Sequence, residues 1–152
     1  RYPYHLLREE MQEFILDKLQ LLIERKLIKG IGENGTEYTV IAQILDLPKE
    51  ILRLIQKFDF TKKNPKLIYI NTGETMISLQ DSILVTFLNL AGFDILFFVP
   101  TGYQSVENYF AEKLMEEHQI GEYKYDMQVP DLNNISTNST RPSWRRKLFR
   151  RG

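Results

Sequence analysis

The chain has 152 residues, of which 43% are hydrophobic, and carries 20 acidic and 20 basic side chains. A chain of this length fits one globular domain and buries enough surface to fold without covalent cross-links. It contains no cysteine, which excludes disulfides, thiolate zinc sites, iron–sulfur clusters and cysteine nucleophiles. No apolar stretch of the sequence approaches the roughly 20 residues that a membrane-spanning helix needs.

Charge is distributed unevenly along the chain. Residues 133–152 carry six basic and no acidic side chains, which leaves 14 basic and 20 acidic side chains in residues 1–132. An acidic body with a basic tail predicts that the tail binds something anionic. Because the chain begins at Arg1 without a secretory signal, we interpret it as one domain of a longer cytoplasmic protein.

The first 66 residues predict a helical layer that does not fold independently. Apolar residues recur at three- and four-residue spacing over residues 5–29, which predicts an amphipathic helix that ends at Gly30. Shorter helices are predicted over residues 37–47 and from Pro48 to about Phe58.

The two shorter helices also have the length and pattern of a helix-turn-helix. Its second helix would present four polar side chains to DNA, namely Lys49, Arg53, Gln56 and Lys57. The acidic body would repel phosphates, so nucleic-acid binding is the less favoured interpretation. The favoured interpretation is that both helices pack under a sheet.

Two short apolar runs that end in Thr-Gly predict parallel strands, over residues 67–70 and 93–99. Helices are predicted over residues 75–91 and 105–118, and an exposed third strand over residues 123–129. The predicted fold class is α/β, with N-terminal helices, then a small parallel sheet of βαβαβ, Rossmann-like type, and a basic C-terminal tail. The predicted parts are a helical layer in 1–66, the βαβαβ half in 67–132, and a linker with the tail in 133–152.

The two Thr-Gly turns would meet at the carboxyl edge of this sheet, where open α/β sheets bind ligands. Glycine lets a ligand approach the backbone, and threonine hydroxyls with helix N–H groups can hold a phosphate or carboxylate. We therefore predict an anionic ligand, a nucleotide or sugar phosphate. The predicted binding residues are Asn71, Thr72, Gly73, Glu74, Thr101, Gly102, Tyr103, Gln104 and Glu107.

Other acids and the histidines contribute less to this prediction. Asp81 is expected about two turns into its helix, and Asp94 at the opposite end of the sheet. Neither His5 nor His118 has a partner at metal-ligand spacing, so no metal site is predicted. No dinucleotide fingerprint, Walker loop or nucleophile elbow identifies a cofactor, a catalytic residue or a reaction. The alternative function is a protein–protein interaction module with no ligand.

The tail mixes cations with Trp144, Leu148 and Phe149. A helix would place Trp144 and Leu148 on one face. Docking onto the acidic body or onto a partner protein is the favoured prediction, with anionic lipid and RNA as alternatives.

Four segments of the sequence resemble the C-terminal part of the YceG-like family. They are residues 58–60, 64–72, 94–107 and 144–149. That family is found in bacterial tellurite-resistance and general stress operons, alongside TerD-like proteins, and is described as a component of a biosynthetic module. The resemblance implies a cytoplasmic role in stress resistance with proteins of the same operon as partners. It supplies no catalytic residues.

Overall fold

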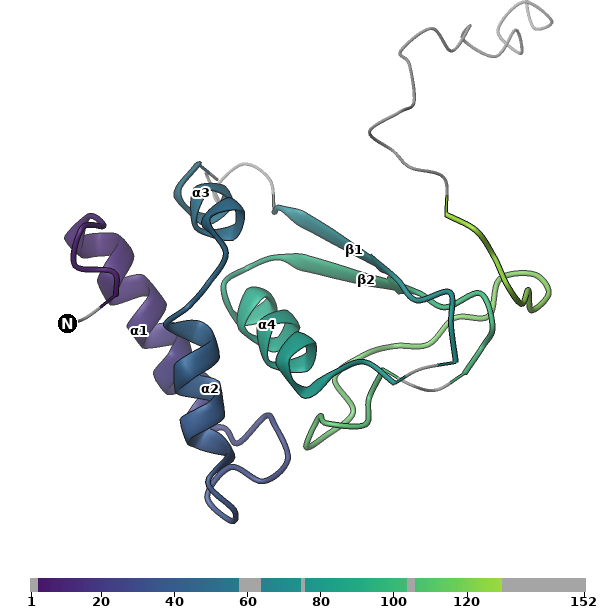
Figure 1. Ribbon diagram of the computed structural model, residues 1–152, viewed down its shortest axis with the longest axis horizontal. Helices are drawn as coiled ribbons and strands as arrows, with labels where there is room; N and C mark the ends of the chain where they lie inside the picture. The colour runs from purple at the N-terminus through teal and green to yellow at the C-terminus, as the bar shows by residue number, and fades with distance from the viewer. Residues whose placement is uncertain (1–2, 58–63, 75, 104–105, 130–152) are drawn as a thin grey trace, which may run out of the picture.

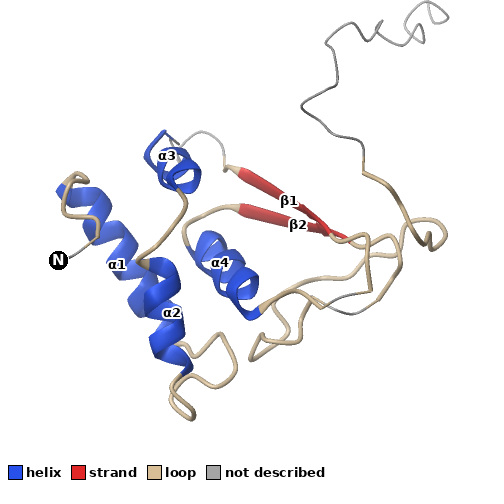
Figure 2. Ribbon diagram, in the orientation of Figure 1, coloured by secondary structure: helices blue, strands red, loops and turns tan. Residues whose placement is uncertain are grey.

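The computed structural model describes residues 3–57, 64–74, 76–103 and 106–129. These residues form α1 (Glu9–Glu24), α2 (Thr36–Ile44), α3 (Lys49–Lys57), β1 (Lys66–Ile70), α4 (Leu79–Leu90) and β2 (Asp94–Phe98). The two strands are parallel neighbours, joined through α4 in one βαβ unit (Figure 1). Helices α1 and α2 pack on α4, which lies between them and the sheet (Figure 2).

Helix α4 is the centre of the core. Its N-cap is Ser78, whose hydroxyl accepts a hydrogen bond of 3.0 Å from the backbone N–H of Asp81. The sequence from Leu79 to Leu90 is apolar on nearly every side, which suits a helix with neighbours on both flanks. Ile83, Phe87 and Leu88 are accordingly fully buried.

The N-terminal helices close the core from the other side of α4. Ile15 of α1 and both Val40 and Ile44 of α2 are completely buried. The Tyr4 hydroxyl joins the segment before α1 to the end of α2. It donates a 2.7 Å hydrogen bond to the Ile44 carbonyl and accepts one of 2.7 Å from the Leu47 N–H. A buried hydroxyl that is satisfied twice fixes this corner of the helical layer.

The segment after β2 returns to the helical layer and pairs with it. Ile28 and Phe110 form an isolated antiparallel bridge. On either side of it, the Lys29 N–H donates to the Tyr109 carbonyl and the Ala111 N–H donates to the Leu27 carbonyl, both at 2.9 Å. These bonds use backbone groups that a helix would need internally. The predicted helix over residues 105–118 is therefore wrong over its described residues, 106–118.

The predicted βαβαβ, Rossmann-like sheet is also wrong, because the described residues form a sheet of two strands. The expected third strand, residues 123–129, is exposed along its whole length and has no buried face to stabilise it. Asp126 has a φ of 52°, in the left-handed region, which interrupts an extended strand. The described fold is a mixed α/β domain with a single βαβ unit.

The other predicted elements are confirmed, most of them with shorter boundaries, although β1 and α2 each begin one residue earlier than predicted, at Lys66 and Thr36. The first helix ends before Gly30 because Lys26 adopts a φ of 49°, and α4 starts at Leu79 because Ser78 caps it. Helix α3 is present, while α2 makes its main contacts with α1 and α4 rather than with a helix-turn-helix partner. The linker and tail, Gln104, and the predicted helix boundaries at residues 58, 75 and 105 lie outside the described residues.

Candidate functional site

The two strands end side by side at the carboxyl edge of the sheet. The Asn71 N–H donates to the Phe98 carbonyl at 3.0 Å, which extends the pairing one residue beyond β1. The chain then turns, with the Gly73 N–H donating to the Asn71 side-chain oxygen at 3.3 Å. After β2, the Gly102 N–H donates to the Val99 carbonyl at 3.1 Å, and Gly102 has a φ of 70°. Both Thr-Gly segments are thus tight turns at one edge.

A hollow of about 450 Å³ lies where β1 gives way to α4. Three of the predicted binding residues, Asn71, Thr72 and Gly73, line it. The remaining lining residues are Tyr69, Ile70, Met76, Ile77 and Asp81. The hollow is therefore built from the first Thr-Gly turn and the start of α4.

Asp81 is held in a defined position at this hollow. Its carboxylate accepts a 2.7 Å hydrogen bond from the Ser78 hydroxyl and lies near the Tyr69 side chain. Burial, followed by the nearby negative charge of Asp81, raises the pKa of Tyr69, so the phenol stays neutral at neutral pH. Asp81 lies in the first turn of α4, not two turns into the helix as predicted.

The second Thr-Gly turn reaches the first through Tyr103 and Glu74. The Tyr103 side chain lies near the Glu74 carboxylate. The negative charge of Glu74, with smaller effects of desolvation and of Tyr125, raises the pKa of Tyr103. This contact brings together two predicted site residues from turns that are distant in the sequence.

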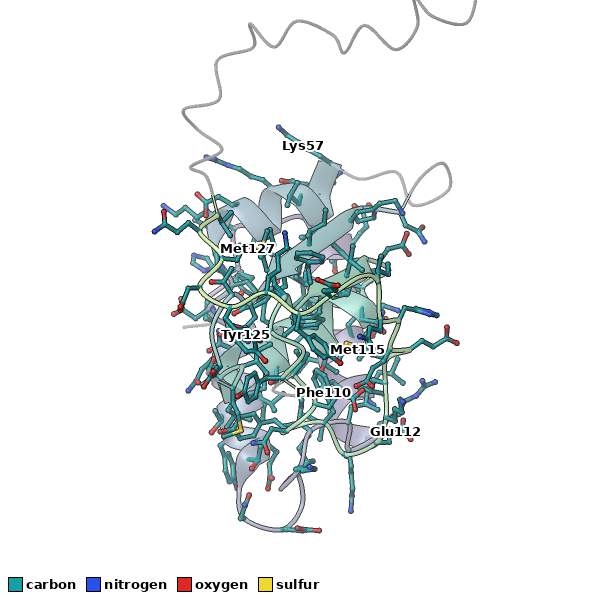
Figure 3. All side chains as sticks on the ribbon, turned by 90° about the vertical axis from the view of Figure 1, so that its right-hand side faces the viewer. Lys57, Phe110, Glu112, Met115, Tyr125 and Met127 are labelled. Carbon is teal, nitrogen blue, oxygen red and sulfur yellow. The ribbon has the colours of Figure 1, made fainter. Side chains whose placement is uncertain are left out.

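The other predicted residues of the second turn do not line the hollow. A Cβ atom placed on Gly102 would lie 2.1 Å from the Tyr123 ring, so this ring covers the glycine. Thr101 is buried, and its hydroxyl oxygen has no hydrogen-bond partner among the described residues; the same holds for Oε1 of Glu107. Figure 3 views this end of the molecule, which residues 106–129 cross, with Phe110, Met115, Tyr125 and Met127 labelled.

Sequence reasoning missed the other five lining residues, Tyr69, Ile70, Met76, Ile77 and Asp81. The capping-box spacing of Ser78 and Asp81, a serine followed three residues later by an acid, was the available signal for the helix start. With Ser78 recognised as the N-cap, Asp81 would have been predicted in the first turn of the helix. Tyr69 could be placed only by knowing which face of β1 meets α4.

The lining has one carboxylate and no cationic side chain. Within the described ranges, no three His, Asp or Glu side chains gather closely enough to hold a metal ion. Nor does any described helix combine the length and apolar character that crossing a bilayer requires.

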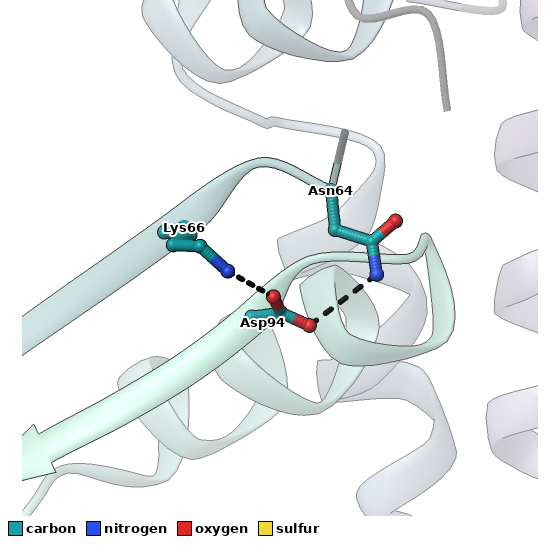
Figure 4. Close-up of polar contacts among 3 residues, drawn as sticks. All are labelled: Asn64, Lys66 and Asp94. Atoms are coloured by element: carbon teal, nitrogen blue, oxygen red, sulfur yellow. Dashed lines mark hydrogen bonds and ion pairs between the residues drawn. The ribbon is translucent and has the colours of Figure 1, made fainter. Parts of the chain in front are cut away.

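A polar cluster marks the opposite end of the sheet, where both strands begin (Figure 4). Lys66 forms an ion pair with Asp94, its partner in the strand register. Asn64 donates to the same carboxylate at 3.4 Å. The hydrogen bond from Lys66, followed by that from Asn64, lowers the pKa of Asp94. Asp94 is therefore remote from the hollow, as its position at the start of the strand predicted.

Comparison with known proteins identifies the family. The profile of the YceG domain matches residues 3–140, which leaves the last twelve residues of the tail outside the match. A protein of Bacillus subtilis (strain 168), named "Uncharacterized protein YceG", is 31% identical over 93 residues. That alignment covers 59% of this chain and 17% of the relative, so the chain spans about a sixth of it. No solved structure matches significantly. The chain belongs to the YceG domain family.

Proposed function

We propose that the domain binds a small hydroxylated molecule, of the nucleotide or sugar-phosphate class, at the carboxyl edge of β1. The observation that carries the proposal is the hollow of about 450 Å³ beside the fixed carboxylate of Asp81. Ligand pockets of proteins have volumes of roughly 300–1,000 Å³, and the volume of the hollow falls within that range. The carboxyl edge is also where open α/β sheets usually bind ligands.

The polar groups of the hollow suit the hydroxyls of a sugar ring. A carboxylate is an acceptor only, and charge-assisted hydrogen bonds from ligand hydroxyls to Asp81 would be short and strong. The Ser78 hydroxyl orients the carboxylate before the ligand arrives. Such preorganisation reduces the free-energy cost of binding. Asn71 and Thr72 add an amide and a hydroxyl to the same wall.

The absence of a cation from the lining constrains the anionic part of the ligand. A phosphate would be repelled by Asp81 and would be directed toward the Thr72–Gly73 turn, where the Thr72 hydroxyl can donate and the Gly73 N–H could donate in place of its bond to the Asn71 side chain. Affinity should then depend only weakly on salt concentration, because no ion pair is formed. We assign no reaction to the site.

We further propose that the longer polypeptide acts in bacterial stress and tellurite resistance as a component of a biosynthetic module, in the cytoplasm and with proteins of the same operon. Membership of the YceG domain family and the sequence resemblance support this role.

A thermal-shift experiment tests the site. The chain is incubated with adenosine, adenosine monophosphate, ribose 5-phosphate or tellurite, and the same panel is applied to Asp81→Asn. The matched control is Asp126→Asn, an exposed acid that does not line the hollow. We expect at least one sugar-containing compound to raise the Tm of the wild type and of the control by mass action.

The same compound should leave the Tm of Asp81→Asn unchanged. Tellurite, which has no sugar, should have no effect on any of the three proteins. A panel without a single shift, or an equal shift in Asp81→Asn, would contradict the proposed site.

A further inference from the structure

The sheet has one covered face and one open face. The pattern of exposure alternates along both strands. Leu67, Ile95 and Phe97 pack against the core cluster that includes α4. The side chains between them form the open face, and their exposed fractions are 61% for Ile68, 41% for Ile70, 57% for Leu96 and 48% for Phe98.

The four open-face side chains form one continuous patch. In the parallel register Ile68 lies opposite Leu96, and Ile70 lies opposite Phe98, so the patch is two residues wide and two residues long. The preceding pair on the same face is Lys66 with Asp94, the ion pair of Figure 4. A polar pair therefore bounds the apolar patch at the start of the strands.

Isolated exposed apolar residues are common on protein surfaces and need no explanation. Ile120, which is 91% exposed in a loop, is such a residue. Four large apolar side chains in register on a regular face are different. Parallel sheets occur almost only with helices on both faces, and here α4 covers one of them.

We propose that an amphipathic α-helix, from a part of the YceG polypeptide outside these 152 residues, docks on the open face through Ile68, Ile70, Leu96 and Phe98. The chain spans only 17% of the Bacillus subtilis relative, so long members of the family contain ample additional sequence. The occupant is a helix because that is how this sheet's other face is covered. This surface meets the proposed ligand site only at Ile70, which also lines the hollow at the carboxyl edge, whereas Ile68, Leu96 and Phe98 do not line it.

The natural absence of cysteine makes a direct test straightforward. Leu96→Cys places a single thiol on the open face, Ile68→Cys is a second variant of the same kind, and Ile120→Cys is the exposed control. Each variant is labelled with a maleimide in two forms, the 152-residue chain and the longest natural polypeptide that contains it. Mass spectrometry of the peptides gives the labelling rate at each position.

In the 152-residue chain, we expect all three positions to label rapidly. In the longer polypeptide, labelling at positions 68 and 96 should slow by roughly tenfold or more, while position 120 keeps its rate. Equal rates in the two forms would overturn the proposal, as would a natural polypeptide with no further residues. Slow labelling in the 152-residue chain would also overturn the proposal. If the protection grows with protein concentration, a second copy of the chain covers the open face. If the protection does not depend on concentration, another part of the same chain covers it.

Discussion

The helical layer and the sheet, which lie on opposite sides of α4, differ in how completely they are packed. In the helical layer, side chains of α1, α2 and α4 are fully buried against one another. The sheet buries one face against α4 and leaves apolar side chains of the other face exposed. The comparison indicates that the helices contribute most of the stability, whereas the sheet provides the hollow and an unfilled surface.

The largest expected effect is on the free energy of unfolding, and it is measured by comparing a phenylalanine of α4 with one of the sheet. Phe87 of α4 is fully buried and Phe98 of β2 is about half exposed. We expect Phe87→Ala to lower the free energy of unfolding by about 3–5 kcal/mol through the cavity it leaves. Phe98→Ala should cost about 1 kcal/mol or less. Urea denaturation of both variants measures the difference, and similar costs would contradict the division into a packed and an open region.

At the carboxyl edge the first Thr-Gly turn lines the hollow, whereas the Tyr123 ring covers Gly102 of the second turn. A pair of glycines tests this closer packing of the second turn. Gly102 and Gly121 have φ values of 70° and 80°. Alanine is strained at both positions by about 1 kcal/mol or more. Only at Gly102 does the new Cβ meet a ring, that of Tyr123, whereas nothing lies within 4 Å at Gly121.

Gly102→Ala should therefore be less stable than Gly121→Ala by about 1–3 kcal/mol, the usual cost of overpacking. Thermal unfolding of the two variants gives the comparison. Equal losses would mean that Tyr123 moves away without cost and that the edge is loosely packed.

Tyr4→Phe tests the helical layer with a smaller change. The variant retains the buried ring but removes the hydroxyl shared by the Ile44 carbonyl and the Leu47 N–H. We expect the free energy of unfolding to fall by about 1–3 kcal/mol, because buried backbone groups lose their partner. A loss near zero in chemical denaturation would show that water reaches this corner.

The smallest effect concerns the exposed ion pair at the start of the strands. The pKa of Asp94 is lowered in the folded state, so its stabilising contribution is complete above the unfolded-state pKa and is lost as the pH falls through the folded-state pKa. Because the pair is exposed, the contribution is small. Asp94→Asn should have a slightly lower urea midpoint than the wild type at neutral pH, and the difference should vanish in strong acid. A difference that persists in acid would exclude this origin.

The elements that sequence reasoning found are those whose signals are local. Apolar runs before Thr-Gly predicted both strands of the described residues, and apolar periodicity predicted the four helices found there. The conformation of residues 106–129 depends instead on contacts with residues that are distant in the sequence. One is the hydrogen bond from the Lys29 side chain to the Asn108 carbonyl, between residues 79 positions apart. No local pattern indicates that Phe110 pairs with Ile28 rather than continuing a helix.

Only the locally encoded part of the candidate site could be predicted from the sequence. Asn71, Thr72 and Gly73 follow β1 directly and line the hollow. The residues of the second turn were grouped with them because parallel strands end at one edge, but the Tyr123 ring covers Gly102. That ring comes from a segment whose path the sequence did not reveal. Asp81 was not predicted as a site residue because the helix was expected to start at residue 75, whereas α4 starts at Leu79.

Hydrogen–deuterium exchange on the 152-residue chain tests the central contrast most directly. Amides of a fully packed element exchange only on global unfolding, whereas those of a two-stranded sheet with an open face exchange by local opening. We predict that amides of α4, including those of Ile83 and Phe87, are the slowest in the molecule. Those of β1 and β2 should exchange several-fold faster. Strand amides as slow as those of α4 would contradict the account, because the sheet would then be as completely packed as the helices.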